Sequence, residues 1–213
     1  MIDVVIIDYG VGNILSVKQA FESFHVKVEV SSDPKKILEA SHTVLPGVGA
    51  FGNAMNALKE CGLVDTVIEI GKKGKPLLGI CLGMQLLLDE SKEFGNTMGL
   101  GLISGKVTPI PEKSKLGHPL KSTNIGWGKL KPKVTTSDWI GTALEDINES
   151  DYLYFVHSFM AQPKNVKNVI AETCVGGNNI PSVISNGNII ACQFHPEKSG
   201  PTGLKILRRF CEY

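Results

Sequence analysis

The ten residues Pro-Leu-Leu-Gly-Ile-Cys-Leu-Gly-Met-Gln, numbered 76–85, decide which fold we expect for this chain. A short apolar run leads to Cys81, and residues of helix-forming composition continue to Ser91. A cysteine between two glycines, where a buried strand meets a helix, has the form of a nucleophile elbow. Gly79 and Gly83 permit close backbone approach, and the N-terminal end of a helix favours a thiolate. Cys81 is therefore a candidate nucleophile, and a buried structural cysteine in a tight turn is the alternative.

The residues before Cys81 alternate between strand and helix patterns. Val4–Ile7 are consecutive β-branched residues, which predicts a strand buried on both faces. Further strands are predicted at 26–30, which is more exposed, and at 43–45. Helical patterns fall between them at 14–24, with Asn13 as the cap, and at 34–38, 51–60 and 64–73. This alternation predicts an α/β fold with a doubly wound, mostly parallel mixed sheet, whose sites lie at the carboxyl ends of the strands.

The second half of the chain predicts antiparallel additions to that sheet. Short apolar pieces among Gly, Pro and Lys residues at 99–134 indicate antiparallel strands and long loops. Clearer strands are expected at 151–156, 169–174, 182–185 and 189–194, the last two joined as a hairpin by Asn186-Gly187-Asn188. A final helix is expected at 203–213. No linker or internal repeat divides the chain, so we expect one domain over 1–213.

Composition excludes several classes of function. A net charge of +1 with 20% charged residues offers no basic field for nucleic acid. Five scattered cysteines without a C-x-x-C pair favour a reducing cytoplasm over a disulfide framework or a metal site. Neither a signal peptide nor a membrane-spanning run is present, so we expect a soluble protein that does not bind a membrane. The glycines of residues 10–13 fail the dinucleotide fingerprint, because Leu15 occupies the third glycine position, and no cofactor is expected.

A cysteine nucleophile needs a base, and the base needs a group that orients it. Of the five histidines, those at 25, 42 and 118 lie in surface or turn contexts and are expected to be solvated, whereas His157 and His195 follow strong strands. His195 is the better candidate, because Pro196 restricts it to an extended conformation and Glu197 follows closely. We therefore predict a Cys81–His195–Glu197 triad. An exposed strand end with a solvated carboxylate is the alternative.

An oxyanion formed at Cys81 also needs hydrogen-bond donors. The backbone N–H of Leu82 is one candidate, because it directly follows the nucleophile. A second is the N–H of Val48 or Gly49, in the glycine-flanked stretch Pro46–Gly49 at the end of a predicted strand. A simple turn without function is the alternative for that stretch.

These motifs together resemble those of the class I (triad) glutamine amidotransferases. The resemblance rests on Gly79–Gln85 followed by Gln193-Phe194-His195-Pro196-Glu197, and it covers essentially the whole chain. Within the family, stretches 8–13, 46–51 and 195–199 are most similar to the glutaminase subunits of imidazole glycerol phosphate synthases, in histidine biosynthesis. The resemblance implies a flavodoxin-like α/β fold.

The resemblance implies a role for each site residue. Cys81 attacks the side-chain amide of L-glutamine, His195 protonates the departing ammonia and then activates water, and Glu197 orients His195. The oxyanion rests on the N–H of Leu82 and one from the 47–49 segment. The residues implied in glutamine binding are Gly47, Gln85, Glu93, Ser158 and Phe159. Without that role, Gln85 and Glu93 would be solvated helix positions.

The resemblance also implies a partner, since ammonia is wasted without an acceptor. The expected partner is a (β/α)8-barrel cyclase subunit, in a heterodimer that makes imidazole glycerol phosphate and AICAR from PRFAR, with Asn13 and Trp127 at the interface. The family's Pro-His-x-Gly-Trp-Asn is Thr-Asn-Ile-Gly-Trp-Gly here, at 123–128. A paralogue that supplies ammonia for amidine formation on a surface sugar therefore remains an alternative. A non-glutamine cysteine hydrolase and a non-catalytic partner-binding subunit are two others.

Overall fold

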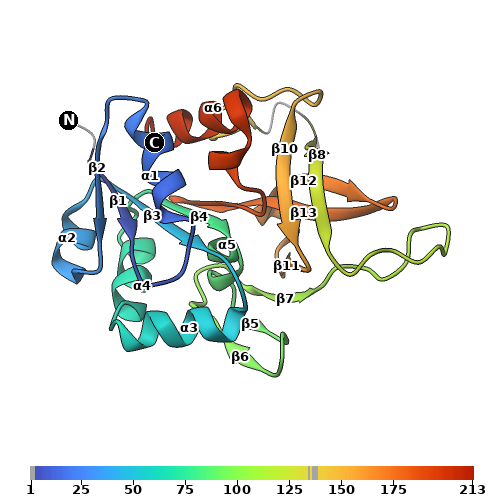
Figure 1. Ribbon diagram of the computed structural model, residues 1–213, viewed down its shortest axis with the longest axis horizontal. Helices are drawn as coiled ribbons and strands as arrows, with labels where there is room; N and C mark the ends of the chain where they lie inside the picture. The colour runs from blue at the N-terminus through green and yellow to red at the C-terminus, as the bar shows by residue number, and fades with distance from the viewer. Residues whose placement is uncertain (1–2, 134, 136–138) are drawn as a thin grey trace.

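A mixed eight-stranded sheet runs through the middle of the computed structural model, which describes residues 3–133, 135 and 139–213 (Figure 1). Five neighbouring strands are parallel, in the order β2 (Lys27–Ser31), β1 (Asp3–Ile7), β3 (His42–Gly47), β4 (Leu77–Cys81) and β14 (Ile189–Cys192). Three antiparallel strands continue the sheet: β13 (Asn178–Asn186), β12 (Val169–Val175) and β9 (Lys131–Pro132). The predicted doubly wound, mostly parallel sheet with antiparallel additions is confirmed.

One face of the sheet is covered by helices and by a smaller sheet. The helices are α2 (Pro34–Glu39), α3 (Phe51–Glu60), α4 (Val64–Lys72) and α5 (Leu82–Leu86). The smaller sheet has the order β11 (Phe159–Pro163), β7 (Gly105–Pro109), β5 (Glu90–Ser91) and β6 (Thr97–Met98). Val5 and Ile7 of β1 point into this core, so the layer buries the alternate residues of the strand.

The opposite face is covered by α1 (Ile14–Glu22), α6 (Gly200–Phe210) and the antiparallel pair β8 (Asn124–Lys129) and β10 (Tyr152–His157). Val4 and Ile6 of β1 point into this second core, where Phe21 of α1 meets Phe210 of α6 edge-to-face with ring centroids 6.3 Å apart. Because β1 is buried on both faces, its continuous apolar run is explained. The prediction that residues 4–7 form a strand buried on both faces is confirmed.

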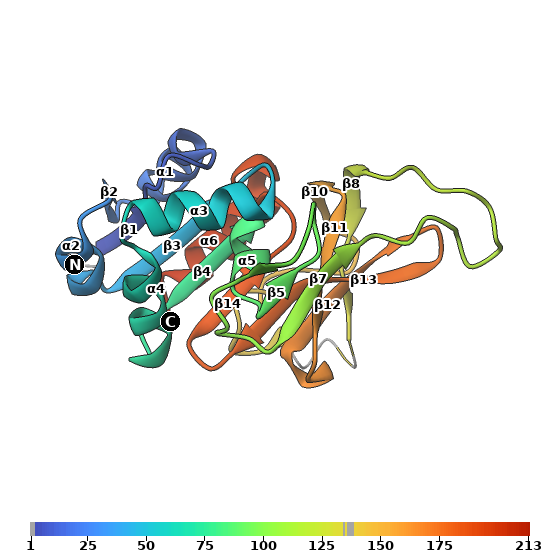
Figure 2. The same ribbon diagram turned by 90° about the horizontal axis from the view of Figure 1, so that it is seen from below.

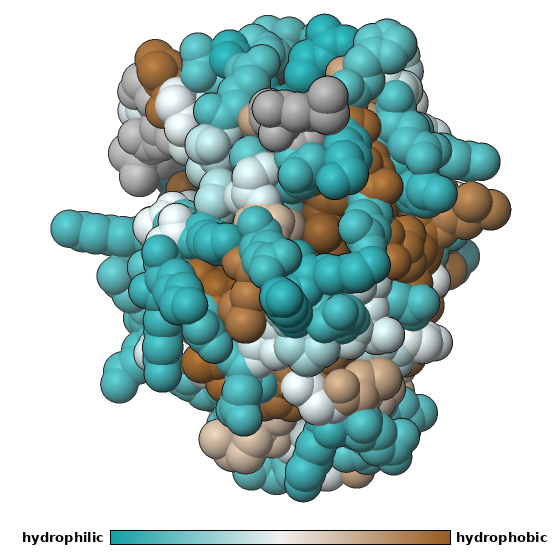
Figure 3. Space-filling view, turned by 90° about the vertical axis from the view of Figure 1, so that its left-hand side faces the viewer, coloured by the Kyte–Doolittle hydropathy of each residue, from teal (hydrophilic) through white to brown (hydrophobic). Residues whose placement is uncertain are grey.

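The edge strand β2 shows how the open end of the sheet is protected. Lys27 pairs with Asp3, and Glu29 pairs with Lys36 of α2, with nitrogen–oxygen distances of 3.7 and 2.6 Å. Charged side chains on an edge strand discourage pairing with another chain. Figure 3 views the molecule from this end, where hydrophilic residues cover most of the surface.

The polypeptide leaves the helical pattern after α5 earlier than predicted. The helix ends at Leu86, and residues 90–91, expected to be helical, form strand β5. The carbonyls of Leu86 and Leu87 accept hydrogen bonds from the backbone N–H groups of Leu100 and Leu102, at 2.8 and 2.9 Å. This returning segment replaces the next helical turn, and its pairing over long sequence distance is invisible to local composition.

The hairpin predicted at residues 186–188 is confirmed, with Gly187 at a φ of +59°. Strand β14 ends at Cys192, two residues before the predicted end, because the chain then crosses toward β10: the N–H of His195 donates to the carbonyl of Tyr154 at 2.9 Å. The predicted final helix is α6, which begins at Gly200 and ends at Phe210. The strand region predicted at 99–134 holds β7, β8 and β9, and its last residue, Val134, lies outside the described residues.

Two further local predictions differ from the structure. His42, expected to be solvated, is buried with its ring 5.3 Å from that of Phe210, because α6 covers it from the far end of the chain. Asn13 precedes α1 as predicted, yet its side chain makes no capping hydrogen bond. Asn13 therefore holds the predicted N-cap position, but its side chain does not cap the helix.

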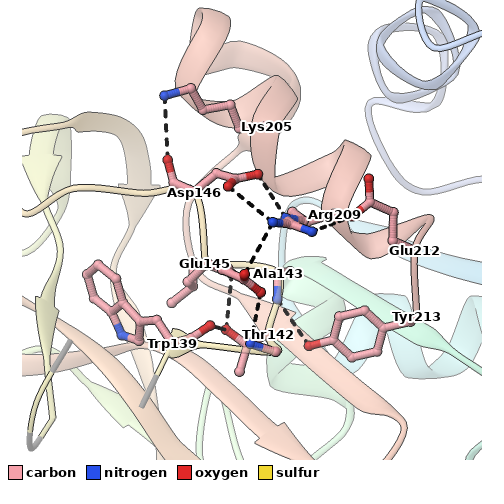
Figure 4. A network of polar contacts seen from close by, with 11 residues as sticks. Trp139, Thr142, Ala143, Glu145, Asp146, Lys205, Arg209, Glu212 and Tyr213 are labelled. Atoms are coloured by element: carbon pink, nitrogen blue, oxygen red, sulfur yellow. Dashed lines mark hydrogen bonds and ion pairs between the residues drawn. The ribbon is translucent and has the colours of Figure 1, made fainter. Parts of the chain in front are cut away.

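A network of polar contacts fastens the segment 139–146 to the end of α6 (Figure 4). Arg209 bonds the carboxylates of Asp146 and Glu212, with shortest distances of 2.8 and 2.6 Å, and pairs with Glu145. The buried Trp139 donates its indole N–H to the carbonyl of Ile170 on β12 at 3.0 Å. The segment is therefore tied both to α6 and to the central sheet.

A long loop, residues 110–123, projects beside the turn that joins β12 and β13 (Figures 1 and 2). Lys115 donates its backbone N–H to the carbonyl of Gly176 in that turn at 2.9 Å, and Asn178 donates to the carbonyl of Lys113 at 2.9 Å. The loop leads directly into β8.

Among the helices of the described residues, none combines the length and the apolar composition that a bilayer span needs.

Substitution of Gly83 by alanine tests the packing of α5 on the sheet. A Cβ at this position would lie 1.9 Å from the carbonyl oxygen of Leu45 in β3, which is backbone and cannot rotate away. We expect Gly83→Ala to lower the free energy of unfolding in urea by about 3 kcal/mol. Gly52→Ala in α3 is the control, because its Cβ would meet Thr97 at an ordinary 3.4 Å. Equal stability of both variants would contradict this packing.

Candidate active site

The carboxyl ends of neighbouring parallel strands meet at one edge of the sheet. Cys81 ends β4, and Gly47 of β3 is its direct register partner. His195 follows β14, the neighbour of β4 on the other side. The loop 8–13 follows β1, which pairs with β3. The fold thus gathers the sequence-predicted residues at the edge where open α/β sheets bind ligands.

Cys81 occupies a strained turn between β4 and α5. Its φ of +55° and ψ of −110° lie outside the regions that a residue with a Cβ ordinarily adopts. Strain of this kind is retained only where the surrounding structure imposes it, and it is typical of a nucleophile elbow. A Cβ at Gly47 would lie 2.9 Å from both Gly83 N and Leu82 Cβ. The predicted elbow is present, and its glycines allow β3 to pack directly against it.

His195 and Glu197 form a buried pair next to Cys81. Nδ1 of His195 lies 2.8 Å from Oε1 of Glu197, and the two side chains are 2% and 0% exposed. Since the carboxylate accepts, Nδ1 donates, and Nε2 is left without a well-formed hydrogen bond among the described residues. An exposed strand end with a solvated carboxylate is therefore excluded.

The electrostatics of the pair favour a protonated imidazole. Burial lowers the pKa of His195, but its interactions with Cys81 and Glu197 outweigh burial and raise that pKa to about 9. The sulfur of Cys81 is near enough to contribute to this shift, although it does not meet the geometry of a formed hydrogen bond to Nε2. The arrangement holds a proton on the imidazole at neutral pH, beside the sulfur.

Backbone contacts to β10 fix the position of His195. Its N–H donates to the carbonyl of Tyr154 at 2.9 Å, and its carbonyl accepts from the hydroxyl of Ser199 at 2.6 Å. The same hydroxyl accepts from the N–H of Tyr154 at 2.9 Å. On the other side, Asn13 donates its amide to Oε1 of Glu197 at 3.3 Å. Asn13 therefore contacts the buried pair from the loop after β1.

A cavity of about 270 Å³ opens beside Cys81. Most of the predicted site residues line it, together with three that the sequence did not single out for the site. The lining residues are Val48, Gly49, Cys81, Leu82, Gln85, Glu93, Thr123, Val156, His157, Ser158, Phe159 and His195. Gly47 and Glu197 are not among the lining residues, and Trp127 lies on β8, outside the cavity. The space beside the sulfur suits a small polar molecule.

Gln85 and Glu93 are both held in place by hydrogen bonds. The amide nitrogen of Gln85 donates to the carbonyl of Phe159 at 3.1 Å and to Oε1 of Gln193 at 2.9 Å. Glu93 accepts from the N–H of Phe51, at the start of α3, at 2.6 Å, where a carboxylate also complements the helix dipole. Neither is a solvated helix position: Gln85 is buried in α5, and Glu93 lies on the loop after β5.

Several residues at the site received no role from the sequence. Tyr9 donates its hydroxyl to the carbonyl of Pro46 at 2.7 Å and so anchors the start of the 46–49 stretch. Thr123 bonds the hydroxyl of Ser158 at 2.7 Å. Gln193 and His157 are two others. Gln193 stands inside the quoted Gln-Phe-His-Pro-Glu motif and His157 ends a strong strand, so the signal was present for both.

His157 supports the cavity wall in its neutral form. Nδ1 lies 2.9 Å from the carbonyl of Phe159, which can only accept, so Nδ1 carries the proton. Nε2 then accepts from the amide of Asn124 at 3.0 Å. Burial lowers the pKa of His157, and nearby His195 lowers it further. Two histidines at one site therefore differ in charge at neutral pH.

No cluster of three or more His, Cys, Asp or Glu side chains within the described residues could hold a metal ion. All five cysteines are free thiols.

Titration of His195 by NMR tests the electrostatics of the buried pair. We expect a midpoint near pH 9 in the wild type and a lower midpoint in Glu197→Gln, because an amide carries no negative charge. A pKa raised above the unfolded value of about 6.5 stabilises the fold below that pH, and this contribution is lost as the pH rises through about 9. An unshifted midpoint in both proteins would contradict the assignment of the pair.

Comparison with known proteins places this geometry in a family. A family model for class-I glutamine amidotransferases matches residues 5–212. The imidazole glycerol phosphate synthase subunit HisH 1 of Legionella pneumophila (strain Lens) is 45% identical over 212 residues, covering 100% of both chains. The subunit HisH of Wolinella succinogenes is 42% identical over 207 residues, covering 97% of this chain and 98% of its own.

Solved structures show the same fold at low sequence identity. The structure of PurLQS from Thermotoga maritima superimposes with a TM-score of 0.74 at 17% identity, over 100% of this chain and 98% of the other. A crystal structure of a glutamine amidotransferase gives a TM-score of 0.71 at 18% identity, over 98% of this chain and 97% of the other. The strained cysteine, the buried histidine–glutamate pair and these matches agree, and the chain belongs to the class-I glutamine amidotransferase family.

Proposed function

We propose that this protein is a glutaminase subunit: a single domain over residues 1–213 that hydrolyses L-glutamine to glutamate and ammonia for use by a partner subunit. The observation that carries the proposal is the strained Cys81 beside the buried His195–Glu197 pair, at the wall of a cavity of about 270 Å³. Full-length relatives named as HisH subunits support the same activity.

The proposed reaction proceeds in two steps at Cys81. The sulfur attacks the side-chain amide carbon of glutamine, and the imidazolium of His195 gives its proton to the departing nitrogen, which leaves as ammonia. A thioester joins the γ-glutamyl group to Cys81. His195, now neutral, takes a proton from water, whose oxygen attacks the thioester and releases glutamate and the thiolate. Glu197 holds His195 so that its Nε2 points toward the reacting atoms.

The negative oxygen formed in each step needs donors. We assign the N–H of Leu82 as one and the N–H of Val48 or Gly49 as the other. Leu82 begins α5, and Val48 and Gly49 line the same cavity as Cys81. Tyr9 supports this stretch through Pro46. Small Gly47 lets the stretch lie against the elbow, because a Cβ there would meet Leu82.

Glutamine would be held by the other cavity residues. Both amide hydrogens of Gln85 are engaged, so its Oε1 is the group that remains for the substrate, as an acceptor from an N–H. Glu93 supplies a carboxylate that complements the α-ammonium group. Ser158 and Phe159 also line the cavity, and His157 and Gln85 keep this segment in place through the Phe159 carbonyl.

The partner, we propose, is a (β/α)8-barrel cyclase subunit that forms a heterodimer with this chain in histidine biosynthesis. The outer face of β8 and β10 carries Trp127 and Ile125, which are 57% and 66% exposed, and the ring of Trp127 packs on Tyr154. Exposed aromatic residues are typical anchors of interfaces. β8 begins next to Thr123 of the cavity wall, so a partner docked there would lie over the site, with Asn13 at the same edge of the sheet.

One of the three departures from the family motif at 123–128 has a local explanation. Gly128 stands where the motif has asparagine, and a Cβ there would lie 3.0 Å from the hydroxyl of Thr173 and 3.1 Å from the ring of Phe155. The substitution thus accompanies close packing of β8 on its neighbours. The HisH names of the full-length relatives favour the histidine pathway over the surface-sugar paralogue.

Substitution of Cys81 tests the activity. In the complex with the barrel subunit, we expect Cys81→Ala to abolish product formation with glutamine and to retain it with ammonium salt, because only ammonia release needs the sulfur. Product is followed by absorbance or chromatography. Cys61→Ala is the control, since Cys61 is an exposed thiol on the helical layer. Full glutamine-dependent activity of Cys81→Ala would point to a non-catalytic subunit.

A glutamine analogue that carries an alkylating group separates glutaminase from other cysteine hydrolases. We expect stoichiometric labelling of Cys81, with protection by L-glutamine. Labelling that glutamine does not prevent would favour a hydrolase for another substrate.

Trp127→Ala tests the proposed docking face. We expect the dissociation constant for the barrel subunit to rise at least about tenfold, as for a central aromatic anchor, in calorimetric titration. Ile140→Ala is the matched control, because Ile140 is 71% exposed in the segment fastened to α6. Equal affinities of the two variants would place the interface elsewhere.

A further inference from the structure

Gln193 is a fully buried polar side chain that the mechanism above does not use. It follows β14 by one residue and precedes His195 by two, and its backbone N–H donates to the carbonyl of Ser182 in β13 at 2.9 Å. Burial of an amide is costly unless its oxygen and nitrogen find partners. Both groups of Gln193 have partners, and each of these lies at the site.

The amide of Gln193 bridges the sulfur and the cavity wall. Its Nε2 lies 3.8 Å from Sγ of Cys81, within the range of a hydrogen bond to sulfur. Its Oε1 accepts from Nε2 of Gln85 at 2.9 Å. Gln85 donates its other hydrogen to the carbonyl of Phe159. The two glutamines therefore connect the reacting atom to the wall that would contact the substrate.

The bridge also fixes the orientation of Gln85. The Phe159 carbonyl can only accept hydrogen bonds, and it accepts one from His157 and one from Gln85. Gln85 must therefore turn an N–H toward it. The Gln193 oxygen takes the second N–H. With both hydrogens directed inward, Oε1 of Gln85 is the atom left to the cavity. Gln193 thereby decides which end of Gln85 a ligand meets.

We propose that Gln193 is a further catalytic residue of the glutaminase reaction: its N–H stabilises the anionic sulfur of Cys81, and its oxygen keeps Gln85 oriented for glutamine. A hydrogen bond to the charged form of a group favours that form. The hydrogen bond from this N–H is strongest while the sulfur is anionic, which is the case before attack and again as the thioester breaks. It weakens while the sulfur is acylated. The role of Gln193 toward glutamine rests on the proposed function, whereas its role toward the sulfur rests on the geometry alone.

Two substitutions separate the roles of the oxygen and the N–H. Gln193→Glu keeps an acceptor for Gln85 but turns an oxygen toward the sulfur. We expect kcat to fall at least tenfold with little change in KM for glutamine, measured in the complex with the barrel subunit. Gln193→Met removes both contacts at similar volume, and we expect a fall in kcat together with a rise in KM. Gln162→Glu, on β11 outside the cavity, is the control.

The pH dependence of alkylation by iodoacetamide provides a readout that does not involve glutamine. Cys81→Ala measured in parallel defines the signal of Cys81 among the five thiols. In both Gln193 variants the midpoint for Cys81 should move to higher pH, since the donor to the anionic sulfur is gone. Thermal melting checks that each variant is folded. If the buried carboxylate of Gln193→Glu prevents folding, Gln193→Met still tests the contact to the sulfur.

The outcomes distinguish the two proposals. An unchanged alkylation midpoint in a folded Gln193 variant overturns the role of Gln193, whatever the substrate. A shifted midpoint in the Gln193 variants, together with a wild-type complex that shows no glutaminase activity, would support the role of Gln193 and overturn the proposed function. Changes in kcat and in midpoint together support both.

Discussion

The close approach of α5 to β3 is the constraint on which the site depends. Gly83 lies so near the carbonyl of Leu45 that no side chain fits, and Gly47 of β3 faces the first residues of α5 in the same way. This contact forces the chain to turn within one residue at Cys81, which takes up the strain as a positive φ. As a result the sulfur sits at the start of a helix, at the edge of the sheet and beside a cavity.

A second constraint is electrostatic. An imidazole and a carboxylate buried together are costly to desolvate and contribute little to stability unless their remaining groups are satisfied. Here Nε2 of His195 and Oε2 of Glu197 have no hydrogen-bond partner within the described part of the chain. Packing alone would not retain such a pair. His195 of this pair lines the same cavity as neutral His157, and perturbed titratable groups gathered at one cavity are typical of sites that transfer protons.

Much of this architecture could be predicted from the sequence, because its signals are local. Consecutive β-branched residues in β1, the glycines around Cys81 and the Asn-Gly turn before β14 each determine the conformation of their own neighbourhood. The rule that sites lie at the carboxyl ends of strands then brought Cys81 and His195 together, since each directly follows a buried strand.

The remaining features depend on contacts between distant segments. α5 ends early because residues 100–103 take over its carbonyls, and His42 is buried because α6 returns over it. Asn13 turns from a helix cap to a partner of Glu197, 184 positions away. The bridge from Cys81 through Gln193 and Gln85 to Phe159 likewise joins three separate stretches. Composition and periodicity carry no information on such pairings.

The central claim is that Cys81 becomes covalently acylated by glutamine. Acid quenching of the complex during turnover, followed by mass spectrometry of the peptide that contains residue 81, tests it most directly. The account predicts the mass of one γ-glutamyl group on Cys81, lost again when glutamine is exhausted. Ammonia release with an unmodified Cys81 peptide, or with the acyl group on another residue, would contradict it.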